Sequence, residues 1–86
     1  MYYDYAELED GTQVAHSGVL ADGIVEVSVE RPVDLGFDSA RCSLPSFEWS
    51  DIEGFTERDM AKVDSFVHNN APLILRLARE ASKSYA

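Results

Sequence analysis

Residues 8–30 read LEDGTQVAHSGVLADGIVEVSVE and contain two Asp-Gly pairs, Asp10-Gly11 and Asp22-Gly23. Asp-Gly between segments of strand character is a strong signal for a two-residue hairpin turn, because both central positions require positive φ. Each pair separates segments in which apolar and polar residues alternate. Two consecutive hairpins predict a three-stranded antiparallel meander.

The two predicted turns also determine which side chains share a face. A two-residue turn at Asp10-Gly11 places His16 opposite Tyr5. The same turn at Asp22-Gly23 places His16 opposite Val29, so the two turns agree on the faces. The predicted buried set is Tyr3, Tyr5, Val14, His16, Leu20, Val25, Val27 and Val29, whereas Asp4, Ala6, Ser17, Glu26, Ser28 and Glu30 face the other way.

A fourth strand is predicted over residues 37–44, where alternation resumes after the loop VDLG at residues 33–36. Pro45 ends this strand because it cannot donate to a ladder. The inward set of the strand is Ala40, Cys42 and Leu44. The segment that follows, residues 49–55, supports at most one helical turn and is interpreted as a connector.

The helical part begins at Thr56, which has the features of an N-cap, with Asp59 at the third helical position. Asn70 and Pro72 interrupt the apolar stripe that follows. Since Pro72 lacks an amide donor and Asn70 is a good N-cap, we expect two helices, broken near Pro72.

The predicted fold is therefore α+β, with a four-stranded antiparallel meander followed by two C-terminal helices that pack on one face of the sheet (ββββαα). All 86 residues are expected to form a single domain. Its parts are the sheet at residues 1–48, the connector at 49–55 and the two helices at 56–86.

The negative charge is concentrated in the first part of the chain. Residues 1–55 contain twelve Asp and Glu and two Arg, a net of −10, while residues 56–86 have a net of +1, giving −9 overall. Such a surplus repels nucleic acid and anionic lipid and attracts basic surfaces at long range.

The residue types that carry chemistry do not form a recognisable constellation. Cys42 is the one cysteine, so no disulfide can form within the chain, and its strand position predicts a buried, unreactive thiol. His16 is expected to be structural and His68 to cap a helix end. We therefore predict no enzyme activity, no catalytic residue, no cofactor and no metal site.

The first ten residues, MYYDYAELED, lack the features of a secretory signal, and no apolar run approaches the ~20 residues of a membrane span. A cytoplasmic location is expected.

The main functional hypothesis is a small inhibitor that binds a basic, nucleic-acid-binding surface of another protein, as anti-CRISPR and other phage anti-defence proteins do. The similarity to those proteins is one of composition only. No direct contact with nucleic acid or membrane is expected. The predicted partner-binding residues are the acids Asp4, Glu7, Glu9, Asp10, Asp22, Glu26 and Glu30, with Phe47, Trp49 and Tyr2 as aromatic anchors.

Two alternatives use the same charge distribution. One is an antitoxin-like or regulatory partner of a basic enzyme. The other is a homo-oligomer, at its simplest a homodimer, in which the basic helix face of one copy meets the acidic sheet of another. That basic face is formed by Arg76, Arg79 and Lys83.

Overall fold

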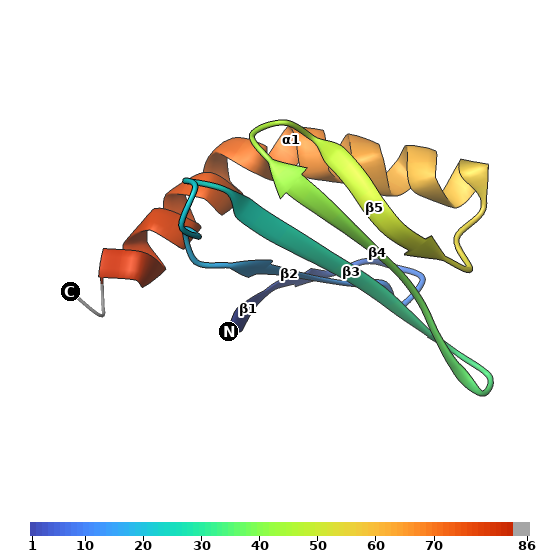
Figure 1. Ribbon diagram of the computed structural model, residues 1–86. Helices are drawn as coiled ribbons and strands as arrows, with labels where there is room; N and C mark the ends of the chain where they lie inside the picture. The colour runs from blue at the N-terminus through green and yellow to red at the C-terminus, as the bar shows by residue number, and fades with distance from the viewer. Residues whose placement is uncertain (84–86) are drawn as a thin grey trace.

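The computed structural model describes residues 1–83 and contains five strands followed by one long helix (Figure 1). The strands are β1 (Tyr2–Glu7), β2 (Gln13–Ser17), β3 (Val25–Val33), β4 (Gly36–Leu44) and β5 (Glu48–Glu53), and the helix is α1 (Glu57–Lys83). The sheet is antiparallel with the order β1-β2-β3-β4-β5, so each strand pairs with its neighbour in sequence. Helix α1 covers one face, and no other described element covers the opposite one.

The α+β class and the antiparallel meander are confirmed, but the prediction of four strands is wrong. Most of the expected connector is β5, which pairs with β4 through Cys42↔Trp49 and Ser43↔Glu48. The sequence does not reveal this strand because it contains a bulge. Asp51 has a φ of 52°, the pairing register shifts beside it, and the alternation of apolar and polar residues is interrupted there.

Both Asp-Gly turns are present, but each has three loop residues instead of two. The N–H of Leu8 donates to the carbonyl of Thr12, and in the second turn the N–H of Leu20 donates to the carbonyl of Ile24. The N–H of each turn glycine, Gly11 or Gly23, donates to the carbonyl of the same leucine, and all four bonds are 2.7–3.0 Å long. Only the last loop residue has positive φ, 88° at Gly11 and 77° at Gly23, as in a turn followed by a glycine bulge.

The longer turns change the pairing of the first three strands. His16 pairs with Tyr3 and Val27, each two residues from the predicted partners Tyr5 and Val29. A shift of two residues leaves side chains on their predicted faces, because the side-chain period of a strand is two. Ala6 is an exception: it pairs with Val14 and lies on the helix side, not on the opposite face predicted for it. The predicted register is therefore wrong, whereas the predicted division of the faces is correct for β2 and β3.

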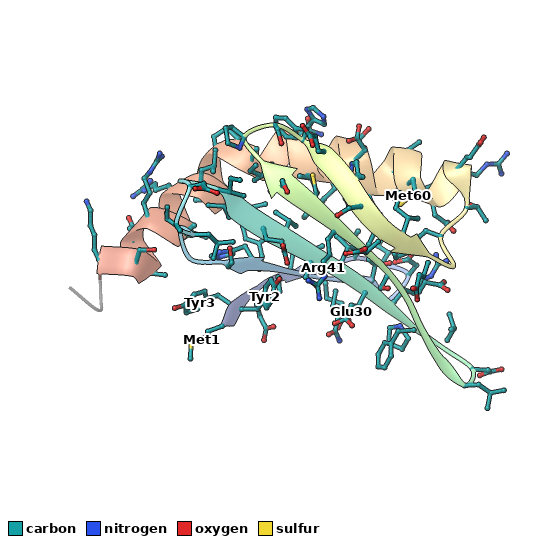
Figure 2. The ribbon with its side chains drawn as sticks, in the orientation of Figure 1. Met1, Tyr2, Tyr3, Glu30, Arg41 and Met60 are labelled. Carbon is teal, nitrogen blue, oxygen red and sulfur yellow. The ribbon has the colours of Figure 1, made fainter. Side chains whose placement is uncertain are left out.

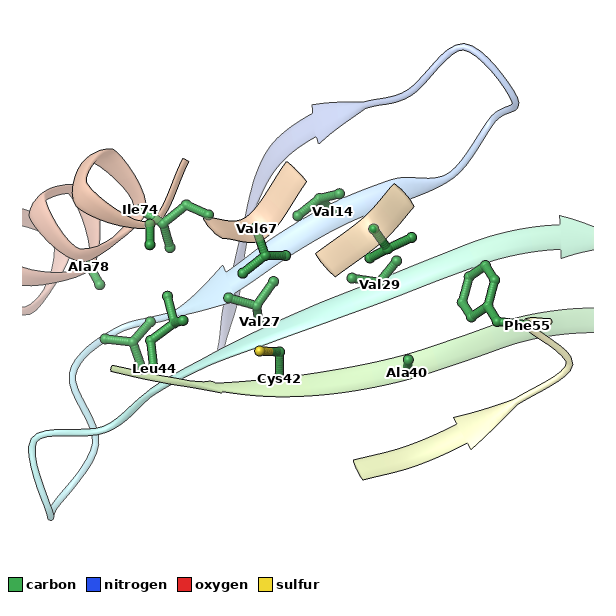
Figure 3. Packing of buried hydrophobic residues seen from close by; sticks show 13 residues of the cluster. Val14, Val27, Val29, Ala40, Cys42, Leu44, Phe55, Val67, Ile74 and Ala78 are labelled. Carbon is green, nitrogen blue, oxygen red and sulfur yellow. The ribbon is translucent and has the colours of Figure 1, made fainter. Parts of the chain in front are cut away.

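The buried face matches the predicted set apart from Leu20, which lies in the second turn and is 47% exposed. His16 is buried, and its Nδ1 lies 2.8 Å from the carbonyl oxygen of Ser17. The fully buried strand residues are Val14, Val25, Val27, Val29, Ala40, Cys42 and Leu44. Figure 3 shows several of them facing Val67 and Ile74 of α1.

A bulge in β1 keeps Tyr5 on the helix side of the sheet. The pairing with β2 shifts between Asp4 and Ala6, which makes Tyr5 the extra residue. Its hydroxyl donates to Oδ1 of Asn70 at 2.6 Å, and its ring meets the edge of Phe66 with the centroids 6.1 Å apart. The bulge thus ties the edge strand to the middle of α1.

The predicted start of the helix is confirmed. The N–H of Asp59 donates to Oγ1 of Thr56 at 3.1 Å, and the N–H of Thr56 donates to Oδ2 of Asp59 at 3.0 Å. These reciprocal bonds form a capping box in which Asp replaces the usual Glu or Gln.

The predicted break at Pro72 is wrong, because α1 runs without interruption from Glu57 to Lys83. The amide of Asn70 does not cap a new helix; it donates to the carbonyl of Phe66 at 2.8 Å and accepts from Tyr5. Pro72 is exposed, and the helix axis changes direction in this region (Figure 1). The predicted helical region extends to residue 86, and residues 84–86 lie outside the described part.

Tertiary packing explains why the helix continues past the proline. The sheet-facing stripe of α1 is buried both before and after Pro72, and its residues are at most 4% exposed. Burial of this stripe against the sheet outweighs the one backbone bond that proline removes. The stripe consists of Val63, Val67, Ala71, Ile74 and Ala78. Within residues 1–83, no helix is long and apolar enough to cross a membrane.

Gly54 joins β5 to α1 and should be the least replaceable glycine. Its φ is 84°, and an added Cβ would lie 2.0 Å from Oδ1 of Asp38. Gly23 has a similar φ of 77° but open space around it, so Gly23→Ala should cost only the left-handed strain of about 1–2 kcal/mol. We expect Gly54→Ala to lower the free energy of unfolding by more, measured by urea denaturation. Equal losses in the two variants would show that the contact with Asp38 is unimportant.

Candidate functional site

The open face of the sheet carries most of the acidic side chains of the strands. Arg41 is the one basic side chain on this face among the described residues. Figure 2 shows Glu30 and Arg41 on the side of the sheet away from α1. By the strand register, the acids on this face are Asp4, Glu7, Glu26, Glu30, Glu48 and Glu53, with Asp51 beside them at the bulge of β5.

Sequence reasoning places Asp4, Glu26 and Glu30 on this face, where the structure also has them. It misses the three acids of β5, Glu48, Asp51 and Glu53, because that strand is interpreted as a connector. The available signal is short: Trp49 is apolar between two polar neighbours, but the bulge at Asp51 ends the alternation.

Arg41 is engaged by a neighbour on the same face. Its Nη1 lies 3.1 Å from Oε1 of Glu26, and the hydroxyl of Tyr2 also donates to this carboxylate. The pKa of Tyr2 is raised, first by burial and then by the bond with Glu26. The single cation of the face is therefore already paired, and the remaining acids determine its field.

A shallow hollow of about 360 Å³ lies in this face, beside the point where β5 bulges away from β4. Its walls combine carboxylates with two serine hydroxyls and the guanidinium of Arg41. The lining residues are Ser28, Glu30, Ser39, Ala40, Arg41, Asp51 and Glu53. Such a surface suits a cationic group of a partner, because the carboxylates outnumber the guanidinium and accept hydrogen bonds.

The acids of the two Asp-Gly turns lie at opposite ends of the sheet. Glu9 and Asp10 lie in the first turn, near the start of α1, and Asp22 lies in the second, near its C-terminal end. The carboxylate of Asp10 accepts from the N–H of Thr12 at 3.0 Å. Hydrogen bonding with Thr12, first through its side chain and then through this N–H, lowers the pKa of Asp10. The structure therefore does not bring Asp22 together with the other two turn acids.

Phe47 and Trp49, the expected aromatic anchors, pack against the helix. The ring of Phe47 stacks on His68 with the centroids 3.8 Å apart, and Nε1 of Trp49 donates to Oδ1 of Asp64 at 2.9 Å. Both are partly buried against the core. Of the three aromatic residues named from the sequence, only Tyr2 lies on the open face.

A charged cluster on the helix side centres on Arg31. Its guanidinium lies 2.7 Å from Asp38, 3.0 Å from Asp59 and 3.3 Å from Asp10. Its Cζ also lies 4.9 Å from the centre of the Phe55 ring. The hydrogen bonds to these carboxylates raise the pKa of Arg31, and the bond to Asp59 has the largest effect. The same bond holds the pKa of Asp59 well below its usual value. The cluster joins four segments of the chain and is a structural feature.

The cysteine and both histidines are separated from the acidic face. Cys42 is completely buried on the helix side, where burial, and to a lesser degree Asp64, raises the pKa of its thiol to about 11. His16 is buried on the same side. His68, predicted to cap a helix end, lies inside the continuous α1 and stacks on Phe47. Across residues 1–83, no group of three His, Cys, Asp or Glu side chains has an arrangement that could hold a metal ion.

The Arg31 cluster predicts a dependence of stability on acid. Because the folded-state pKa of Asp59 is depressed, its stabilising effect is complete above its unfolded pKa of about 3.9 and is lost as the pH falls further. We expect the urea midpoint of the wild type to fall more between about pH 6 and about pH 3 than that of Asp59→Asn. Asp22→Asn, in an exposed turn, controls for the loss of one charge. Identical pH dependence in the wild type and Asp59→Asn would contradict this role.

The burial of Cys42 predicts a slow thiol. Native protein should react with a thiol reagent far more slowly than protein unfolded in urea, because the thiolate is rare and shielded. Cys42→Ser should cost about 1–3 kcal/mol of unfolding free energy, since it places a hydroxyl in an apolar site. Cys42→Ala adds no polar group and serves as the control. Fast stoichiometric labelling of the native protein would show that the site opens readily.

Comparison with known protein families, with curated proteins and with solved structures gives no match. The function is therefore argued from the surface itself. Its most distinctive feature is an uncovered sheet face on which seven carboxylates accompany one arginine.

Proposed function

We propose that this protein is a small, non-enzymatic binding module that occupies a basic, nucleic-acid-binding surface of another protein and inhibits it. The observation that carries the proposal is the open face, where acids lie on β1, β3 and β5 and Arg41 of β4 is already paired with Glu26. A cytoplasmic setting fits this activity, since nucleic-acid-binding proteins work there.

The geometry of the face supports binding to an extended cationic surface. The acidic strands β1, β3 and β5 are alternate strands of the sheet, so they lie ~9.6 Å apart, and side chains on one face of a strand repeat every ~6.8 Å. Carboxylates at these intervals form a dense negative field that attracts lysine and arginine side chains and accelerates encounter. A protein surface that binds the phosphate backbone presents such cations.

An antitoxin-like role rests on the same physics and differs only in the identity of the partner. The homo-oligomer has a specific observation in its favour, because the exposed cations Arg76, Arg79 and Lys83 of α1 complement the acidic face. Sedimentation at low and high salt distinguishes it: salt-sensitive self-association at micromolar concentration would favour the oligomer, and a monomer would favour a separate partner.

Charge reversal on the open face should weaken partner binding. Glu30 and Glu53 are the best positions, because both are exposed and line the hollow, whereas Glu26 bonds to Tyr2 and Arg41. We expect the double variant Glu30→Lys, Glu53→Lys to lower the association rate at least about tenfold at low salt, with a smaller effect on dissociation. The measurement is surface plasmon resonance against the protein that the wild type captures from cells of its source.

The matched control is the double variant Glu57→Lys, Glu80→Lys, which changes the net charge equally but alters exposed positions of α1. It should associate at close to the wild-type rate. The nucleic acid that the partner binds should compete with the wild-type protein for the same surface of the partner. Equal slowing by both double variants would mean that net charge alone acts, and an association rate indifferent to salt would contradict the proposal.

A further inference from the structure

The hairpin of β3 and β4 extends beyond the rest of the sheet (Figure 1). Pairing of β3 with β2 reaches only Glu30, and pairing of β4 with β5 reaches only Ser39. The two strands nevertheless remain paired to Val33 and Gly36. Residues 32–37, which we term the hairpin tip, therefore project as a two-stranded ribbon without a neighbouring strand on either side.

The hairpin tip exposes apolar side chains. Phe37 is 63% exposed, Val33 is 44% exposed and Leu35 is fully exposed. Exposed aromatic and aliphatic side chains gathered at one place are typical of contact surfaces, whereas a single one is ordinary.

Leu35 is the most informative of them. Its φ is 70°, in the left-handed region that Gly and Asn adopt readily and a leucine adopts only with strain. Because its side chain is fully exposed, the fold gains no burial from it. A residue that strains the backbone of the hairpin and adds nothing to the core is best explained by a contact outside the chain.

The root of the hairpin tip is held firmly. Arg31 and Asp38 pair across the two strands, with Nε and Nη2 of Arg31 lying 3.0 and 2.7 Å from Oδ2 of Asp38. The same guanidinium bonds to both carboxylate oxygens of Asp59 at the start of α1, at 3.3 and 3.0 Å. A ribbon anchored in this way loses little conformational freedom on binding.

The hairpin tip continues the acidic face. Pro32 pairs with Phe37, and the preceding row on the same side is Glu30 with Ser39. Phe37 therefore lies on the open side, one row beyond the acidic hollow. The aromatic anchor that a charged interface needs for slow dissociation is present here, in place of the helix-packed Phe47 and Trp49.

We propose that the hairpin tip is the apolar anchor of the binding surface, with Leu35 and Phe37 entering an apolar pocket that borders the basic surface of the protein partner. This inference rests on the proposed function and names the second half of its interface. The charge around the hairpin tip indicates which kind of partner it contacts. The tip carries Asp34 and adjoins Glu30 and Glu53, a combination that favours a cationic protein and opposes an anionic lipid surface.

Site-specific photocrosslinking inside the cell tests the contact directly. The variant Leu35→p-benzoylphenylalanine, produced in cells of the source, should crosslink to one protein at an apolar residue that adjoins a lysine- or arginine-rich surface. Leu20→p-benzoylphenylalanine, at the other end of the sheet and 47% exposed, is the matched control and should not crosslink to that protein. Crosslinks to a second copy of the chain, to lipid, equally from both positions, or to nothing would each overturn the proposal.

Kinetics with the crosslinked protein as purified partner then separate this inference from the proposed function. Leu35→Gly and Phe37→Ser should each raise the dissociation rate about tenfold or more and leave the salt dependence of association unchanged, whereas Leu20→Ser should alter neither rate. Leu35→Gly should be at least as stable as the wild type in thermal unfolding, because glycine suits the positive φ. Weakened binding of this variant therefore cannot be attributed to misfolding.

The outcomes are distinguishable. If charge reversal at Glu30 and Glu53 slows association while the two tip variants dissociate at the wild-type rate, the anchor is refuted and the proposed function stands. If the tip variants dissociate faster and the charge reversal has no effect, the partner is held by apolar contact alone, and the proposed function and the inference that rests on it both fail.

Discussion

The guanidinium of Arg31 is the interaction on which the arrangement of this small domain depends. It bonds to Asp38 of β4, to Asp59 at the start of α1 and to Asp10 of the first turn, and it lies over the ring of Phe55. A single cation thereby fixes the hairpin root, the first turn and the helix start relative to one another. Its removal would leave three carboxylates close together without a counter-charge, which is far more costly than the loss of one exposed ion pair.

The position of Arg31 also determines the charge of the opposite face. Residues 1–55 have only two arginines, and one of them points toward the helix while Arg41 is bonded to Glu26. The open face therefore keeps nearly all of its negative charge. Mutual repulsion among its acids opposes folding, and packing of α1 on the far side of the sheet compensates for that repulsion. The electrostatics of the surface and the core are thus linked through one side chain.

Sequence reasoning succeeded where the signal was local and periodic, as for the facing of Val25, Val27 and Val29 and the cap at Thr56. It failed where two structures share one local signal, since Asp-Gly suits both two-residue and three-residue turns. It also failed where tertiary contacts decide, since burial of α1 before and after Pro72 keeps the helix continuous. Of the candidate site, the charge sign and part of the acidic face were predictable, whereas the bulge at Asp51 concealed the rest.

The two sides of the sheet are under different physical constraints. On the helix side, Tyr5, Trp49 and Arg31 each make specific contacts with α1, so substitutions there alter the fold. On the open side and at the hairpin tip, side chains such as Glu30 and Leu35 are exposed, and their identity is free to be selected for a partner. Leucine at a position whose backbone suits glycine is difficult to explain by stability. The charged face and the apolar tip are then complementary parts of one surface, since long-range charge accelerates encounter and apolar contact slows release.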